Sequence, residues 1–179
     1  MIRKILLAIL LISLITGIGF AFQNEPDGFR GLKWGDAPTE DMYFSYQVAY
    51  KDDYLQDING NYYDKIGDNP YIGNVKLYSI DYIFNLCNNQ LYRVQANFYD
   101  EIDYNILKII FKDKFGKPTK EEKYFLYWGG EKVHIHILFK STGYGKGYGS
   151  FQITSEEFYI KNVPEINEQK ELEKAKEDF

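Results

Sequence analysis

The stretch Tyr92-Arg93-Val94-Gln95-Ala96-Asn97-Phe98 alternates between apolar and polar side chains over its whole length. Successive side chains of a β-strand point to opposite faces, so a period of two is typical of a strand that is buried on one side. We therefore predict a half-buried strand, with Tyr92, Val94, Ala96 and Phe98 on its covered face.

Neighbouring segments repeat this pattern. Apolar residues occupy every second position from Ile80 to Leu86 and from Val133 to Phe139, and a glycine-rich turn over residues 143–149 leads into Phe151 and Ile153. Together with Tyr124 to Trp128, they predict a meander of antiparallel strands. A slip in phase near Ser79 suggests a β-bulge.

Two shorter signals predict local turns. Asn59-Gly60 stands between strand-forming residues, and this pair favours a tight hairpin because both residues tolerate positive φ. Residues 36–41 combine acidic residues with Pro38, which favours a short helical turn.

A helix is expected from Asp103, as its N-cap, to Phe115. Its apolar positions follow the spacing of three and four that defines a buried stripe. They are Tyr104, Leu107, Ile110, Phe111 and Phe115. Gly116 and Pro118 end the helix. The sequence thus predicts a single α+β domain over residues 28–160, with a twisted antiparallel sheet and one main helix packed on one face.

The two ends of the chain differ from this domain. Arg3 and Lys4 precede an apolar run and small residues up to Ala21, which predicts a signal peptide over residues 1–21; an uncleaved membrane anchor is the alternative. We therefore expect an exported protein, periplasmic or secreted, with no membrane span after cleavage. Residues 161–179 are rich in charge and predict a solvated C-terminal helix or tail.

Charge and cysteine content narrow the function. The chain has 21 basic and 26 acidic residues, and removal of Arg3 and Lys4 leaves 19 basic residues and a net charge of −7. Nucleic acid is an unfavourable partner for such a chain, because its basic residues are interleaved with acidic ones. Cys87 is the only cysteine, so no internal disulfide can form.

No catalytic constellation emerges from the motifs. His134 and His136 would point to one strand face, but a metal pair needs a third ligand, and exposed strand histidines explain the spacing better. Asp57, Asn59 and Asn61 match the start of a calcium loop, but Tyr62 stands where that loop needs a glycine, so the hairpin explains these residues better. Cys87 lies in an expected turn, where a packed or reduced thiol is favoured over a nucleophile. We predict no enzyme activity, no metal and no cofactor.

A surface remains as the candidate site. If the helix covers the apolar side of the sheet, polar and aromatic side chains lie on the other side, a composition typical of protein recognition. The candidate binding residues are Arg93, Gln95, Asn97, Tyr127, His134, His136 and Gln152. A merely hydrated outer sheet face is the alternative.

Four short motifs carry a resemblance. They are Phe29-Arg30-Gly31-Leu32-Lys33-Trp34-Gly35, Ile80 to Phe84, Phe115 to Pro118 and Leu126 to Gly129. The chain resembles small exported bacterial proteins of unknown function that begin with Phe-Arg-Gly-x-x-Trp-Gly. More distantly, it is similar to β-lactamase-inhibitor-like modules and to outer-membrane assembly lipoproteins. The resemblance implies a helix on a curved antiparallel sheet and a non-catalytic binding module, although this chain lacks a lipidated cysteine and has a tyrosine-rich hairpin instead of a fuller first helix.

We therefore expect a protein-binding module whose partner is another envelope protein. The alternative is a protein that binds or hydrolyses a sugar or lipid through the aromatic hairpin. A closed apolar cleft beside that hairpin would favour the alternative, whereas an open face would favour a protein partner.

Overall fold

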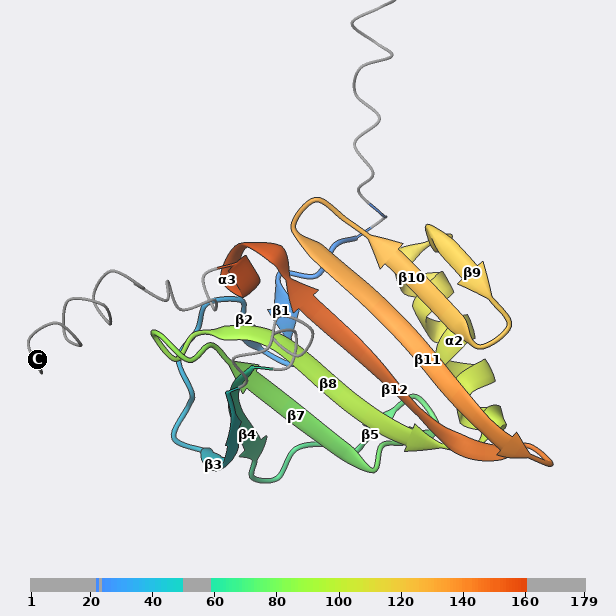
Figure 1. Cartoon of the computed structure of the whole chain (residues 1–179), viewed down its shortest axis with the longest axis horizontal. Coiled ribbons are helices and arrows are strands. Elements are labelled where there is room, and N and C mark those ends of the chain that lie inside the picture. Colours follow the sequence, from blue (N-terminus) through green and yellow to red (C-terminus); the bar gives the residue numbers. More distant parts are fainter. Residues whose placement is uncertain (1–21, 23, 50–58, 161–179) are drawn as a thin grey trace, which may run out of the picture.

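The computed structural model describes residues 22, 24–49 and 59–160, which form one large antiparallel sheet with two helices and two small hairpins (Figure 1). The order of the large sheet is β3-β4-β7-β8-β12-β11-β10-β9. Its strands are β3 (Met42–Val48), β4 (Gly60–Lys65), β7 (Ser79–Phe84), β8 (Leu91–Tyr99), β9 (Lys120–Glu122), β10 (Phe125–Gly129), β11 (Val133–Gly143) and β12 (Lys146–Ser155). The α+β class, dominated by antiparallel sheet, is confirmed at this level, including the meander of β10, β11 and β12.

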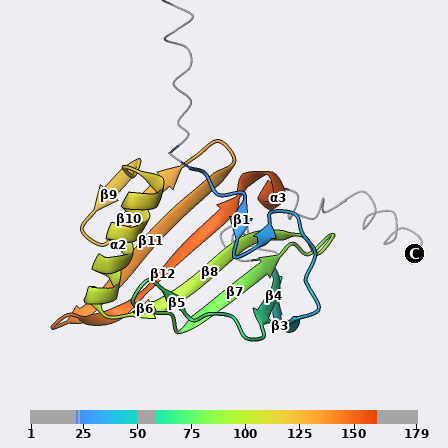
Figure 2. The same cartoon turned by 180° about the vertical axis from the view of Figure 1, so that it is seen from behind.

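The remaining elements lie mainly on one side of the sheet. Figure 2 shows helix α2 (Glu101–Phe115) in front of β10, β11 and β12, beside the hairpins β1 (Gly28–Phe29) with β2 (Leu32–Lys33) and β5 (Tyr71–Ile72) with β6 (Val75–Lys76). We call this side the covered face and the opposite side the open face. The short helix α3 (Glu156–Ile160) follows β12 at one end of the sheet.

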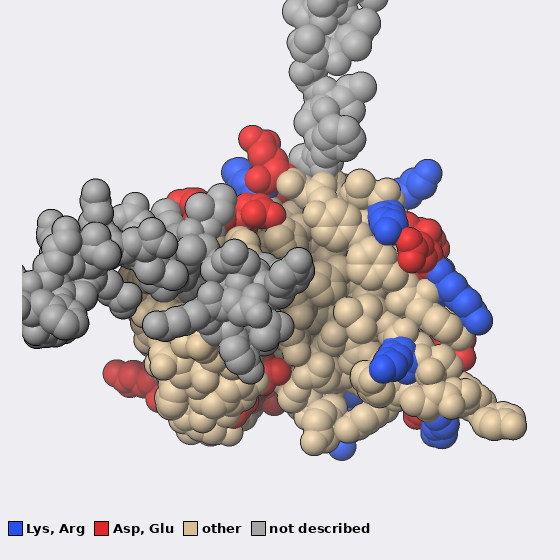
Figure 3. All heavy atoms as spheres, in the orientation of Figure 1, with Lys and Arg blue, Asp and Glu red and all other residues tan. Residues whose placement is uncertain are grey.

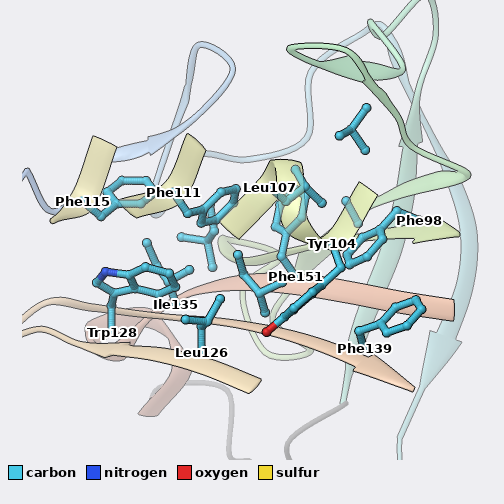
Figure 4. Packing of buried hydrophobic residues seen from close by; sticks show 14 of the residues in the cluster. Phe98, Tyr104, Leu107, Phe111, Phe115, Leu126, Trp128, Ile135, Phe139 and Phe151 are labelled. Atoms are coloured by element: carbon cyan, nitrogen blue, oxygen red, sulfur yellow. The ribbon is translucent and has the colours of Figure 1, made fainter. Parts of the chain in front are cut away.

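The core lies between α2 and the sheet (Figure 4). Leu107, Phe111 and Phe115 project from the helix toward Trp128 and Ile135 on the strands. The indole Nε1 of Trp128 donates a hydrogen bond of 3.0 Å to the carbonyl of Gly116, so the end of the helix is tied to β10. Aromatic and β-branched residues, which suit a pleated strand surface, make up most of this cluster.

The helix begins three residues earlier than predicted, because its N-cap is Asp100 and not Asp103. Its first residue is Glu101, and Asp100 precedes it without a side-chain capping bond. The Glu101 amide instead donates a hydrogen bond of 2.9 Å to the carbonyl of Gly145, in the turn between β11 and β12. A backbone partner from a distant turn replaces the predicted Asp103 cap, and such a contact leaves no local sequence signal.

Tyr92 lies on the open face, contrary to the prediction. Ile83 pairs with Arg93 while Phe84 pairs with Leu91, so Tyr92 is an extra residue in β8. At such a bulge two successive side chains lie on the same side of the sheet. Tyr92 therefore joins Ile83 in a small cluster separate from the main core.

The bulge expected near Ser79 is instead a break between two strands. β6 ends at Lys76 and β7 begins at Ser79. Val75 and Leu77, which seemed out of phase, pack in the main core beneath α2. The change of phase in the sequence thus marks two separate strands rather than an irregularity within one.

The tight turn predicted at Asn59-Gly60 is wrong. Gly60 pairs with Val48 inside β4, so the connection between β3 and β4 runs through residues 49–59. A Cβ atom on Gly60 would lie 2.5 Å from Cγ2 of Ile83. The glycine therefore permits close packing against β7 and does not form a two-residue turn.

Two further local predictions are corrected. Residues 36–41 contain no helix. The amide of Leu91 donates to the carbonyl of Asp36, at the start of β8, and the amide of Ile66 donates to the carbonyl of Asp41, so the segment passes from β8 to the end of β4. The glycine-rich turn is also shorter than expected, because β11 extends to Gly143 and β12 begins at Lys146. Cys87 does lie in the turn between β7 and β8, but it is exposed and not packed.

The Phe-Arg-Gly start has a structural role. Arg30 and Gly31 have φ of 50° and 85°, which lets them form the two-residue turn between β1 and β2. The Arg30 guanidinium forms an ion pair of 2.8 Å with Asp68 and a hydrogen bond of 2.9 Å to the Tyr71 carbonyl. The motif thereby joins two hairpins that cover the core.

The two ends of the chain fall outside this description. The predicted signal peptide (1–21) and C-terminal helix or tail (161–179) lie outside the described residues. Within residues 22, 24–49 and 59–160, neither helix has the length and apolarity needed to cross a membrane.

The two edges of the sheet differ in length and charge. β9 has three residues, all charged and exposed, and its Glu121 forms ion pairs with Lys108 and Lys112 of α2. β3 has seven residues without any charge, and five of them are exposed. Charged side chains and short length each discourage an edge strand from pairing with a strand of another molecule. Of the two edges of this sheet, only β9 has both features.

Candidate binding face

The candidate residues are aligned by the register of the sheet. Each row across the open face joins side chains from adjacent strands, because directly paired residues share a face. The first row comprises Tyr127, His136, Gln152, Gln95 and Asp81. The second comprises Phe125, Leu138, Ser150, Asn97 and Ser79. The third comprises His134, Thr154, Arg93, Ile83 and Tyr62. All seven candidate residues therefore lie on one face.

The middle of this face carries uncharged polar groups that pair with one another. Gln152 donates a hydrogen bond of 2.6 Å from Nε2 to Oε1 of Gln95. Asn97 donates one of 2.7 Å from Nδ2 to the hydroxyl of Ser79. Figure 3 shows the described part of the face to be uncharged over most of its area. These cross-strand bonds give each of the amides a partner on a neighbouring strand.

Arg93 is buried rather than displayed. Only 5% of the residue is exposed, and its Nε donates a hydrogen bond of 3.1 Å to the Thr154 hydroxyl. Its guanidinium lies 5.3 Å from the centre of the Tyr92 ring and 5.5 Å from that of Tyr159. Helix α3, which the sequence analysis missed, supplies Tyr159 and removes Arg93 from the accessible part of the face. In the sequence, the acidic pair Glu156-Glu157 could have indicated this helix, because acidic residues favour a helix N-terminus.

The two histidines are half-buried and have different surroundings. His134 pairs through Nδ1 with Glu156, at the start of α3. The pKa of His136 is lowered to about 4, mainly by burial and in smaller part by the nearby Arg93 and His134. His136 is therefore neutral at neutral pH. The described residues contain no group of three or more His, Cys, Asp or Glu side chains that could hold a metal ion.

Acidic and tyrosine side chains gather near β3 and β4. Burial raises the pKa of Asp81, and the carboxylate of Asp64 raises it further. The ring of Tyr46 stacks on Tyr62 with 4.4 Å between centres, and burial raises the pKa of Tyr46 to about 12. Some tyrosines of the β3–β4 hairpin thus pack on one another.

Three hollows in the described part of the surface lie away from that hairpin. Their volumes are about 500, 490 and 410 Å³. No residue of β3 or β4 lines any of these three. The first two open near Tyr99 and Tyr148, and the third lies between α2 and the β1–β2 hairpin.

Comparison with protein-family models, with curated proteins and with solved structures found no match.

The state of His136 predicts how stability depends on pH. Between pH 6.5 and about 4, the unfolded chain binds a proton on this imidazole that the folded chain does not bind. The free energy of unfolding should therefore fall as the pH falls through this window, with a contribution from His136 of about 3 kcal/mol, and this contribution should level off below it. Urea denaturation at a series of pH values measures the effect.

The matched variants are His136→Gln and His134→Gln. The first should flatten the pH profile between pH 6.5 and 4, because it removes the group that titrates there in the unfolded chain. The second retains His136, whose pKa is lowered mainly by burial, and should keep most of that slope. Superimposable profiles for the wild type and His136→Gln would contradict the prediction.

Proposed function

We propose that this protein is a non-catalytic binding module of the cell envelope, which contacts another protein through the open face of its sheet. The observation that carries the proposal is the row formed by Tyr127, His136, Gln152 and Gln95 on adjacent strands. Protein interfaces are enriched in aromatic residues and depleted of charge at their centres, and this row has that composition.

The side-chain pairing on this face supports the same function. Its amides are paired across strands, with 2.6 Å between Gln152 and Gln95, so few side chains need ordering when a partner binds. Fixed side chains reduce the entropic cost of association. The expected signal peptide supports a location in the envelope, and with Arg93 buried the accessible face is centred on Tyr127 and Gln152.

Site-specific photo-crosslinking tests the proposal. Benzoylphenylalanine would replace Tyr127 on the open face or, as the control, Ile109, which is 68% exposed on α2. After irradiation of cells that naturally make the protein, we expect a covalent adduct with a second protein from position 127 only. The change Gln152→Arg, in the same row, should reduce its yield because it places an unpaired charge in the interface.

Two results would overturn the proposal. One is an equal yield of the same adduct from positions 127 and 109, which would indicate contact without preference for a face. The other is an adduct from position 109 alone, which would place the partner on α2.

A further inference from the structure

A hollow lies near one end of the open face, where a row of smaller side chains is followed by a row of tyrosines. Leu138, Ser150 and Asn97 form one row across β11, β12 and β8, and Tyr148 and Tyr99 form the next row toward the β11–β12 turn. The hollow has a volume of about 500 Å³ and lies where these two rows meet. Its polar lining groups come from Asn97 and Ser150, and tyrosine rings form its walls.

Three tyrosines around the hollow present ring surface to solvent. Tyr78 is 71% exposed, Tyr99 50% and Tyr148 49%. The rings of Tyr78 and Tyr99 lie 5.2 Å apart at an angle of 59°. Exposed rings of this size cost hydration free energy. Tyr78 and Tyr99 are tilted against each other and not stacked face to face as Tyr46 and Tyr62 are, and Nζ of Lys140 lies 5.7 Å from the centre of the Tyr148 ring.

A second hollow begins on the other side of the same two rings. It has a volume of about 490 Å³ and is lined by Tyr99 and Tyr148 together with Asp100, Thr142 and Lys146. Lys146 and Asp100 form an ion pair of 3.1 Å, so they add little net charge. Tyr99 and Tyr148 thus form a ridge between two hollows, and a ligand that fills both must be elongated and must cross the ridge.

We propose that these two hollows bind an uncharged oligosaccharide that lies across the Tyr99–Tyr148 ridge. The C–H face of a sugar ring packs on the electron-rich face of an aromatic ring, and sugar hydroxyls pair with amide and hydroxyl groups such as those of Asn97 and Ser150. The first hollow has no charged side chain in its lining, which favours an uncharged ligand. A lipid chain fits less well, because the half-exposed walls would leave it in contact with water.

Calorimetric titration of the purified protein tests the proposal, with cellohexaose, maltohexaose and chitohexaose as uncharged probes and hexagalacturonate as the charged one. We expect saturable binding of at least one uncharged hexamer. Tyr99→Ala and Tyr148→Ala should each raise its Kd about tenfold, because each removes a stacking surface. Tyr99→Phe and Tyr148→Phe keep the rings and should change the Kd little.

The control is Tyr43→Ala, at a tyrosine that is 52% exposed on β3, far from the ridge; it should leave the Kd unchanged. Circular dichroism checks that each variant is folded, and the phenylalanine variants remain informative if an alanine variant is not. Absence of binding by all three uncharged hexamers at about 10 mM, or a Kd that Tyr99→Ala and Tyr148→Ala leave unchanged, would overturn the proposal. Preference for hexagalacturonate over every uncharged probe would do the same. The outcome is independent of the protein partner, because purified protein and defined sugars are the only components.

Discussion

Replacing Trp128 with alanine should lower the free energy of unfolding by about 3–5 kcal/mol. The side chain is fully buried, and its ring lies 6.1 Å from that of Phe111 on α2. The change leaves a cavity between helix and sheet and leaves the Gly116 carbonyl without its indole donor at 3.0 Å. Both losses act at the joint between α2 and β10, so they weaken the same contact.

Trp128→Phe separates the two contributions. Phenylalanine keeps most of the ring volume but cannot donate to Gly116, so this variant should lose about 1–2 kcal/mol. Tyr144→Ala, at a fully exposed turn residue, serves as the surface control and should change stability little. Urea denaturation followed by circular dichroism gives the three values. A loss below about 1 kcal/mol for Trp128→Ala would contradict the packing of α2 on the sheet.

The second large effect is expected at Gly149, which pairs directly with Phe98 in the neighbouring strand. A Cβ atom at Gly149 would lie 2.3 Å from the Phe98 ring and 2.7 Å from the carbonyl oxygen of Leu138. The ring of Phe98 therefore covers the place where a side chain would stand. Gly149→Val should lower the free energy of unfolding by about 3 kcal/mol, although valine is by itself a better strand former.

Ser150→Val is the matched control, because it introduces the same side chain one position along β12, on the open face. It should change stability by less than about 1 kcal/mol. In the background of Gly149→Val, the further change Phe98→Leu should restore part of the loss by making room, which a double-mutant cycle would detect. If Gly149→Val were as stable as Ser150→Val, Phe98 would not occupy this position.

Period-two patterns predicted the composition of the open face well because they depend only on strand geometry. Gln95, Asn97 and Gln152 lie on one face, as alternation requires, and so do His134 and His136. The same pattern gave the wrong face for Tyr92. The extra residue in β8 moves the Tyr92 side chain to the open face, although the alternation of apolar and polar residues in the sequence continues unchanged. A bulge is determined by what both strands pair with, so one strand's sequence does not reveal it.

The other features that the sequence did not predict also depend on residues far away in the sequence. Helix α3 has five residues, too few for a helical period to be visible, yet it supplies the Tyr159 ring that packs on Arg93. The Asn59-Gly60 pair has the composition of a tight turn, but its glycine is required by contact with Ile83. The hollows beside Tyr99 arise from the register of three strands, which alternation within a single strand does not determine.

The unequal edges of the sheet limit how this protein could self-associate through its backbone. The β3 edge is long and uncharged, whereas the β9 edge is short and carries three charged side chains. A fibre that grows by strand addition needs a receptive edge on both sides of every subunit. With one receptive edge, two copies joined β3 to β3 would leave only blocked edges outside, so growth would stop at a pair.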